Sequence, residues 1–169
     1  MLETTLRARP YGVPNTLYRC LTFRLGGAEY GIDILQVQEI RSYVAPTRIA
    51  NASPELLGVI DLRGVIVPIL DARLKFNYPV AAYTPSTVVI VLNLQDTVLG
   101  VVVDAVSDVL HLAPHDIKPP PPIYTHMDAG FVTGLAQVGE RMLILIDTGA
   151  FLAGSVPERD LLATTVTVD

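Results

Sequence analysis

Hydrophobic residues in this chain form short runs, many of them β-branched, rather than a helical repeat. The clearest example is a pair of runs, Val59–Leu62 and Val65–Leu70, on either side of Arg63 and Gly64. Two such runs around a glycine predict a β-hairpin, because glycine readily adopts the positive φ of a tight turn. The pattern therefore places Arg63 at a hairpin corner, with a long cationic side chain.

The same pattern continues along the chain and predicts about nine short strands. The remaining runs are Leu17–Leu25, Glu29–Ile32, Ile40–Tyr43, Thr87–Leu94, Val98–Val109, Phe131–Val138 and Met142–Ile146. Gly100 within the longest run is expected to allow a bend. No long amphipathic helix pattern interrupts these runs, so we predict an all-β barrel or sandwich.

Short helical turns are expected where an aspartate or serine precedes a brief helical pattern. The predicted starts are Asp33, Ser53-Pro54-Glu55, Asp71 and Asp147. Pro68 lies inside a predicted strand and cannot donate to a ladder of hydrogen bonds. It therefore predicts an edge strand or a bulge at that point.

The predicted strands fall into two sets of similar size on either side of Asn77–Pro85, which contains two prolines and is the best candidate for an internal linker. We expect one domain over residues 16–155. It would hold one small barrel at roughly 16–78 and another at roughly 85–146, with exchange of strands between them allowed. Residues 1–15 are expected to form a flexible leader, and residues 156–169 a helical turn and tail.

Composition narrows the classes of function. Half of the 169 residues are hydrophobic and only 17% are charged, which favours equally a large core or an apolar surface kept for a partner. The net charge is −5 with no basic block, so nucleic-acid binding is not expected. A lone cysteine, Cys20, and no visible signal peptide favour the cytoplasm. The apolar runs are too short to insert into a membrane.

No arrangement of residues predicts catalysis, a cofactor or a metal. His111, His115 and His126 could reach a zinc site only by converging with Asp116 or Asp128, and surface histidines are favoured instead. Asp104 and Asp108 lie four apart and would share one face of a strand. They are more simply the solvated positions of that strand than a reactive carboxylate pair.

Glu39 and Arg63 are the more informative charged residues. Each lies where an apolar segment ends, so the two side chains could meet as an ion pair. Their spacing alone gives equal weight to two unrelated surface charges.

Several longer motifs together resemble the CheW family, the bacterial chemotaxis coupling proteins. They occur in unbroken order from about Tyr18 to Phe151 and are Tyr30–Arg41, Arg48–Asn51, Leu62–Ile69, Thr87–Leu94, Val106–Leu110 and Arg141–Ile146. The resemblance implies two intertwined five-stranded SH3-like β-barrels with short helices. It also implies a non-catalytic adaptor that links the cytoplasmic tip of methyl-accepting chemoreceptors to the regulatory domain of the histidine kinase CheA.

The resemblance further implies recruitment of this cytoplasmic protein to membrane-associated receptor arrays, with other copies of itself in rings. It implies that the helical hairpin of the receptor lies in a groove between the barrels. The positions that match receptor-contacting residues of the family are Ile34, Val37, Glu39, Gly58, Arg63, Val88 and Val109. In the family, the matches of Glu39 and Arg63 form an ion pair at that groove.

Matches to the kinase contact are weaker. Lys118 and Ile123 stand where relatives carry Arg and Phe, and both replacements lose planar contact area. Asp61 stands where close relatives often have Asn. Two alternatives remain open at this point: the same module in a chemosensory pathway for twitching motility or second-messenger control, and a small β-barrel enzyme.

Overall fold

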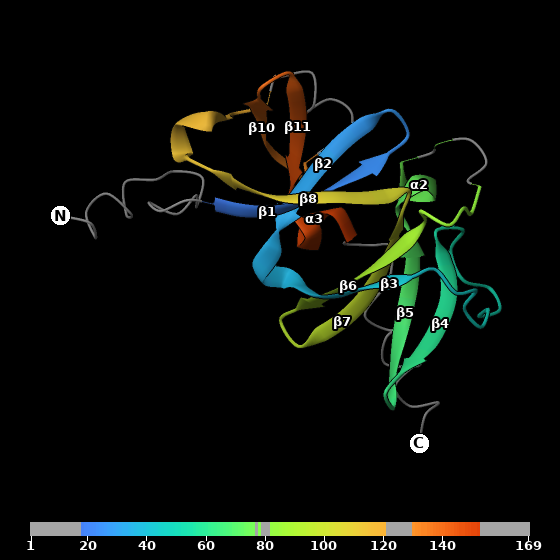
Figure 1. The fold of residues 1–169 in the computed structure, drawn as a ribbon. Coiled ribbons are helices and arrows are strands. Elements are labelled where there is room, and N and C mark those ends of the chain that lie inside the picture. The colour runs from blue at the N-terminus through green and yellow to red at the C-terminus, as the bar shows by residue number, and fades with distance from the viewer. Residues whose placement is uncertain (1–17, 77, 79–81, 121–129, 153–169) are drawn as a thin grey trace. The chain divides into compact units, whose positions relative to one another are not determined.

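The computed structural model of this chain describes residues 18–76, 78, 82–120 and 130–152. Over these residues the fold is all-β, with two sheets and a few short helices (Figure 1). The chain divides into two compact units. Over the described residues, one contains Tyr18–Leu35 together with Ser107–Phe151, and the other contains Gln36–Val106 and Leu152. We call them the six-stranded unit and the five-stranded unit.

The six-stranded unit joins strands from both ends of the described chain. Its sheet has the order β8-β1-β2-β11-β10-β9. The strands are β1 (Tyr18–Leu25), β2 (Ala28–Asp33), β8 (Ala105–Leu112), β9 (Ile117–Lys118), β10 (Val132–Val138) and β11 (Arg141–Ile146). Parallel pairing of β11 with β2 joins the two ends of the sequence. The core of this unit contains Cys20, Leu112, Ala136, Leu143 and Leu145.

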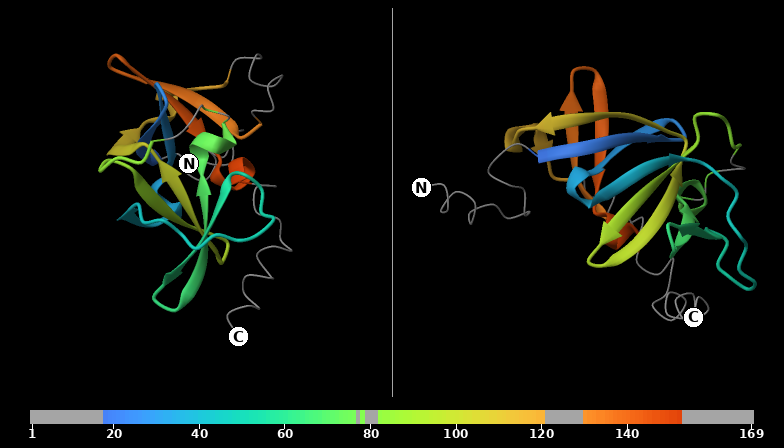
Figure 2. Two further views of the ribbon diagram at one scale, coloured as in Figure 1. Left: turned by 90° about the vertical axis from the view of Figure 1, so that its right-hand side faces the viewer. Right: turned by 60° about the horizontal axis from the view of Figure 1, so that its bottom comes forward.

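The five-stranded unit is built from the middle of the chain, and its sheet has the order β3-β6-β7-β5-β4. Its strands are β3 (Val37–Ser42), β4 (Leu56–Leu62), β5 (Val65–Asp71), β6 (Val88–Leu94) and β7 (Thr97–Val103). The β4–β5 hairpin is the long green hairpin at the bottom of the left view in Figure 2. The core of the five-stranded unit contains Leu62, Val67, Ile69, Val89, Val91 and Val102.

This arrangement differs from a division into two consecutive sets of strands. β1 and β2 join the sheet of β10 and β11, so strands from before and after the Asn77–Pro85 segment share one sheet. The predicted strand Val98–Val109 breaks at Asp104 into β7 and β8, one in each sheet. Gly100 lies within the continuous strand β7, and a Cβ there would lie 2.5 Å from the Ile69 side chain. It is needed for close packing within β7. The predicted leader and tail lie outside the described residues.

One local prediction was wrong, and another was wrong in one of its two alternatives. Of the edge strand or bulge predicted at Pro68, the edge strand is wrong, because β5 is flanked by β4 and β7; an irregularity does lie nearby in the β4–β5 ladder, between Leu56 and Gly58. Pro68 is tolerated because its partner Val59 exchanges backbone hydrogen bonds with Thr47, and the parallel ladder with β7 begins at Ile69. Ser53-Pro54-Glu55 starts no helix. These residues form a turn, and the Glu55 carbonyl accepts from the Asp71 amide instead.

The three aspartate caps are confirmed by their hydrogen bonds. The side chains of Asp33, Asp71 and Asp147 accept from the amides of Leu35, Arg73 and Ala150 respectively. They begin η1 (Ile34–Gln36), α2 (Ala72–Lys75) and α3 (Thr148–Leu152); the further helical turn is η2 (Pro114–Asp116). Among the residues that the structure describes, no helix is long and apolar enough to cross a membrane.

The two edge strands of the five-stranded sheet, β3 and β4, are joined by the chain that follows β3. Thr47 and Val59 form a two-way backbone bridge, with N–O distances of 2.9 and 2.8 Å. Gly58 makes this approach possible. It is buried with φ at +151°, and a Cβ there would lie 2.0 Å from the Thr47 carbonyl oxygen.

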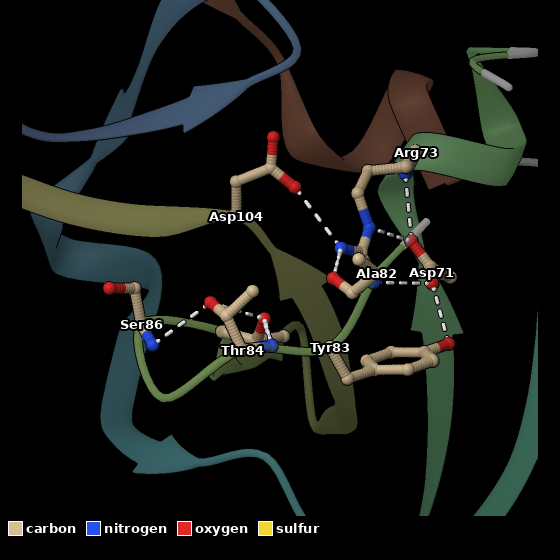
Figure 3. Close-up of polar contacts among 8 residues, drawn as sticks. Asp71, Arg73, Ala82, Tyr83, Thr84, Ser86 and Asp104 are labelled. Atoms are coloured by element: carbon tan, nitrogen blue, oxygen red, sulfur yellow. Dashed lines mark hydrogen bonds and ion pairs between the residues drawn. The ribbon is translucent and has the colours of Figure 1, made fainter. Parts of the chain in front are cut away.

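A buried ion pair joins the end of β5 to the end of β7 (Figure 3). Arg73 and Asp71 are 4% and 0% exposed, and the Arg73 guanidinium donates to both carboxylate oxygens of Asp71. The same guanidinium reaches Asp104 at 3.1 Å and the Ala82 carbonyl at 3.0 Å. Burial opposes the charged form of Arg73, but the hydrogen bonds that it donates to the Asp71 and Asp104 carboxylates raise its pKa above the ordinary value.

Tyr83 completes this cluster. Its hydroxyl donates to Asp71 at 3.0 Å, its ring faces the Arg73 guanidinium at 4.8 Å, and Tyr43 stacks on it with ring centroids 4.2 Å apart. Burial, with the Asp71 carboxylate adding to it, raises the pKa of the Tyr83 hydroxyl. Because the buried polar atoms have partners, the cluster fixes the segment before β6 against β5 and β7.

We predict that Arg73→Met lowers the free energy of unfolding by about 3–5 kcal/mol, because Asp71 would keep a buried charge without its cation. Urea unfolding followed by circular dichroism measures this. Arg24→Met, at an exposed arginine of β1, serves as the control and should change stability by less than about 0.5 kcal/mol. The double variant with Asp71→Asn should recover part of the loss. A single variant as stable as wild type would remove this pair from the stability of the fold.

We predict that Gly58→Ala destabilises the protein by about 2–4 kcal/mol, through steric overlap with Thr47 and backbone strain. Gly27→Ala is the matched control, since a Cβ at Gly27 meets nothing within 4 Å and its φ is not positive. Thermal melting of both variants tests this. Equal melting temperatures would show that the contact between the two edges does not need glycine.

Candidate functional site

The β4–β5 hairpin ends in a tight turn at Arg63 and Gly64. Leu62 pairs with Val65, and the two residues between them have φ of 52° and 89°, as in a type I′ turn. Gly64 therefore has the positive φ that the sequence predicted. The Gly64 amide also donates to Oδ1 of Asp61 at 2.7 Å. Both the left-handed backbone and this side-chain bond hold Arg63 at the hairpin corner.

Arg63 forms an ion pair with Glu39 of β3, which confirms the predicted contact. Nη2 of Arg63 donates to Oε2 of Glu39, and Nη1 of Arg41 lies 3.8 Å from the other oxygen, Oε1. Side-chain exposure is 66% for Arg63 and 26% for Glu39, so the pair is open to solvent on the arginine side. The contact therefore joins β3 to the far hairpin of the same sheet at the protein surface.

The energetics show that this arrangement contributes little to the fold. A left-handed backbone costs about 1–2 kcal/mol at a residue other than glycine. An exposed ion pair returns only about 0–1 kcal/mol. Asn-Gly would be the favoured sequence for this turn. Arginine is therefore held here at a net cost, and the β6–β7 turn of the same sheet likewise holds Gln95 and Asp96 at positive φ.

The other predicted receptor-contacting residues of the five-stranded unit have different surroundings. Val37 begins β3 and is half-buried, with a bulge between it and Glu39. Val88 begins β6 opposite Ser42 and is also half-buried. Gly58 is buried, and its lack of a side chain is already explained by the approach of Thr47. Direct contact of Gly58 with a partner therefore stays a prediction.

Ile34 and Val109 belong to the six-stranded unit. Ile34 is half-buried in η1, and Val109 is 44% exposed on β8. β8 is an edge strand of its sheet and is fixed through Asp108, whose side chain points to the face opposite Val109 because strand side chains alternate. Thr22 of β1 donates to Asp108, so Val109 is carried on a strand with a defined position.

Arg141 extends this polar network across the sheet. Its guanidinium forms two hydrogen bonds with Asp108 and two with Glu29 of β2. These bonds from Arg141 lower the pKa of both carboxyl groups below their ordinary values. Asp104 and Asp108, which the sequence placed on one strand face, belong to different units, where Asp104 is paired with Arg73 and Asp108 with Arg141.

Sequence reasoning missed two features of the surface around the ion pair. Arg41 is a second cation beside Glu39, and it could have been found because residues two apart on a strand share a face. Val65 follows the turn and is 52% exposed. Its hydrophobic side chain did not predict this exposure, because most hydrophobic residues of the chain lie in predicted strands.

The remaining predicted site residues are only partly covered by the structure. Lys118 is exposed on β9, where it pairs with Leu135 of β10. Ile123, the other predicted kinase contact, lies outside the described residues, and so does His126. In the part of the chain that the structure describes, no cluster of His, Cys, Asp and Glu could hold a metal ion. Cys20 is buried, and burial raises the pKa of its thiol to about 11.

Comparison with known proteins gives consistent results. The profile of the family described as "CheW-like domain" matches residues 19–155. The chemotaxis protein CheW of Klebsiella aerogenes is 53% identical over 133 residues, which cover 79% of this chain and 80% of that protein. The chemotaxis protein CheW of Bacillus subtilis is 31% identical, over 79% of this chain and 86% of that protein.

A solved structure agrees with these relatives. The scaffolding protein TtCheW from Thermoanaerobacter tengcongensis matches with a TM-score of 0.72 and 31% identity, over 78% of this chain and 89% of that chain. The all-β fold with two sheets is thus the fold of a known scaffolding protein. From its profile match, its relatives and its fold, we conclude that this chain belongs to the CheW-like domain family.

Proposed function

We propose that this protein is a non-catalytic scaffold that couples methyl-accepting chemoreceptors to the histidine kinase CheA in chemotaxis signalling arrays. Relatives over most of its length are named chemotaxis proteins, and a protein of the same fold is named as a scaffolding protein. The proposal includes action in the cytoplasm, at the cytoplasmic tips of the receptors.

The observation that carries the proposal is the ion pair between Glu39 and Arg63. Both residues match receptor-contacting positions of the family, and the structure brings them into contact on an exposed surface. The tight turn needs a left-handed backbone at this position, but an arginine there, where asparagine is favoured, has no evident benefit for the fold. A role in receptor binding accounts for the arginine and for its exposure.

The physical logic is that of a helix bound against an apolar surface with a charged pair beside it. Apolar side chains such as Val37 and Val88 would lose water on contact with a receptor helix, and the ion pair would fix the register of that helix. Ile34 and Val109, on the six-stranded unit, are the other apolar side chains that we propose as receptor contacts. Gly58 would act through the backbone that it allows rather than through a side chain.

The second partner in this proposal is the regulatory domain of CheA, with Lys118 and Ile123 as contacts. Lys118 is exposed on a two-residue strand at the end of its sheet. An exposed sheet edge with a cation is compatible with a small interface of this kind. Further copies of this chain would join receptor and kinase in rings.

We predict that Arg63→Ala and Arg63→Asn weaken binding of a chemoreceptor-tip fragment by about 30-fold or more, the effect of removing a charge whose partner is buried on binding. Stability should stay within about 1 kcal/mol of wild type, because only an exposed pair is lost. Asn should melt higher than Ala, since Asn-Gly suits a type I′ turn. Titration with the fragment and thermal melting provide the two measurements.

Glu39→Ala should weaken receptor binding similarly, and the double variant Glu39→Ala with Arg63→Ala should lose less than the sum of the single losses. Binding to the regulatory domain of CheA serves as the control and should be unchanged in all these variants. If Arg63→Asn binds the receptor tip as wild type does, the site is wrongly assigned. If it melts far below wild type, Arg63 serves the fold instead.

A further inference from the structure

The five-stranded sheet contains two hairpins that end in the same kind of turn. Arg63 and Gly64 join β4 to β5, while Gln95 and Asp96, with φ of 50° and 72°, join β6 to β7. Both turns thus hold a residue other than glycine in the left-handed region at the first central position. In the β4–β5 turn, the residue at that position is Arg63, which is paired with Glu39 on β3.

The Arg63 turn has a specific hydrogen bond to its backbone. Asp61, two residues before Arg63, accepts from the Gly64 amide at 2.7 Å, on the solvent-exposed side of the hairpin. A side-chain acceptor across a turn restricts the backbone of the residues that it encloses. Arg63 is one of the two residues between Asp61 and Gly64. Its left-handed backbone and the direction of its side chain are therefore set within this closed ring.

We infer that Asp61 is a positioning residue for Arg63. It holds the turn in the conformation that directs the guanidinium to Glu39, and so prepares the charged pair before a partner binds. The hydrogen bond of Asp61, rather than its charge, carries this role. Preparing a side chain in its bound position strengthens binding because less freedom is lost on association. The inference rests on the proposed function, since it concerns binding through Arg63.

The test uses the full chain and a purified cytoplasmic-tip fragment of a methyl-accepting chemoreceptor. Asp61→Ala should weaken binding by about three- to tenfold, the range that one net hydrogen bond corresponds to. Asp61→Asn retains a side-chain acceptor and should bind within about twofold of wild type. If the Asn variant loses as much as the Ala variant, the charge of Asp61 acts and its hydrogen bond does not.

Asn93→Ala is the matched control, because Asn93 occupies the same place before the β6–β7 turn as Asp61 does before the Arg63 turn. It should leave binding within about twofold of wild type. An equal loss in both hairpins would assign the effect of Asp61 to the stability of the sheet and overturn the inference.

A thermodynamic cycle separates this inference from the proposed function. In the Arg63→Ala background, Asp61→Ala should have no further effect on receptor binding, because Asp61 acts only through Arg63. A loss that persists in this background overturns the inference. If Arg63→Ala weakens binding while Asp61→Ala does not, the inference fails and the proposed site stands. If Arg63→Ala leaves binding unchanged, the proposed site itself fails.

Discussion

The buried contact between Asp71 and Arg73 is the constraint on which the rest of the five-stranded unit depends. A charged pair with almost no exposure must have nearly all its hydrogen bonds satisfied, because any unpaired atom would carry a large desolvation cost. Arg73 meets this requirement by reaching Asp104 at the end of β7 and the carbonyl of Ala82 before β6. The end of β5, the entry to β6 and the exit from β7 are therefore fixed together.

The ion pair between Glu39 and Arg63 also joins an arginine to a carboxylate, but it contributes little to the stability of the fold. There, solvent screens the charges, so the contact adds little to folding, and the left-handed backbone of Arg63 adds a cost. The difference between the two pairs is burial. A buried pair specifies how strands meet, whereas an exposed pair stays open to solvent and specifies little. Asp71 and Arg73 fix the end of β5, the strand that begins at the turn of Arg63 and Gly64.

Local features of the fold were predictable from the sequence because they depend on neighbours along the chain. The β4–β5 hairpin, the positive φ of Gly64 and the cap at Asp71 follow from residue type and short spacing. Predictions failed where a distant segment changed the local rule. Pro68 lies inside the sheet because its partner Val59 forms its backbone hydrogen bonds with Thr47. The Glu55 carbonyl accepts from the distant Asp71 amide in place of a helical donor.

The sequence by itself determined the strand-rich fold class and the short helical caps. Through resemblance it also determined the family and the residues to examine, among them Glu39 and Arg63. Only the tertiary structure decided which strands share a sheet, because the parallel pairing of β2 with β11 joins segments whose separation leaves no periodic signal. It also decided that Arg73 is buried and Arg63 exposed. Residue type is the same for both arginines, and only the packing of distant strands around each one sets its exposure.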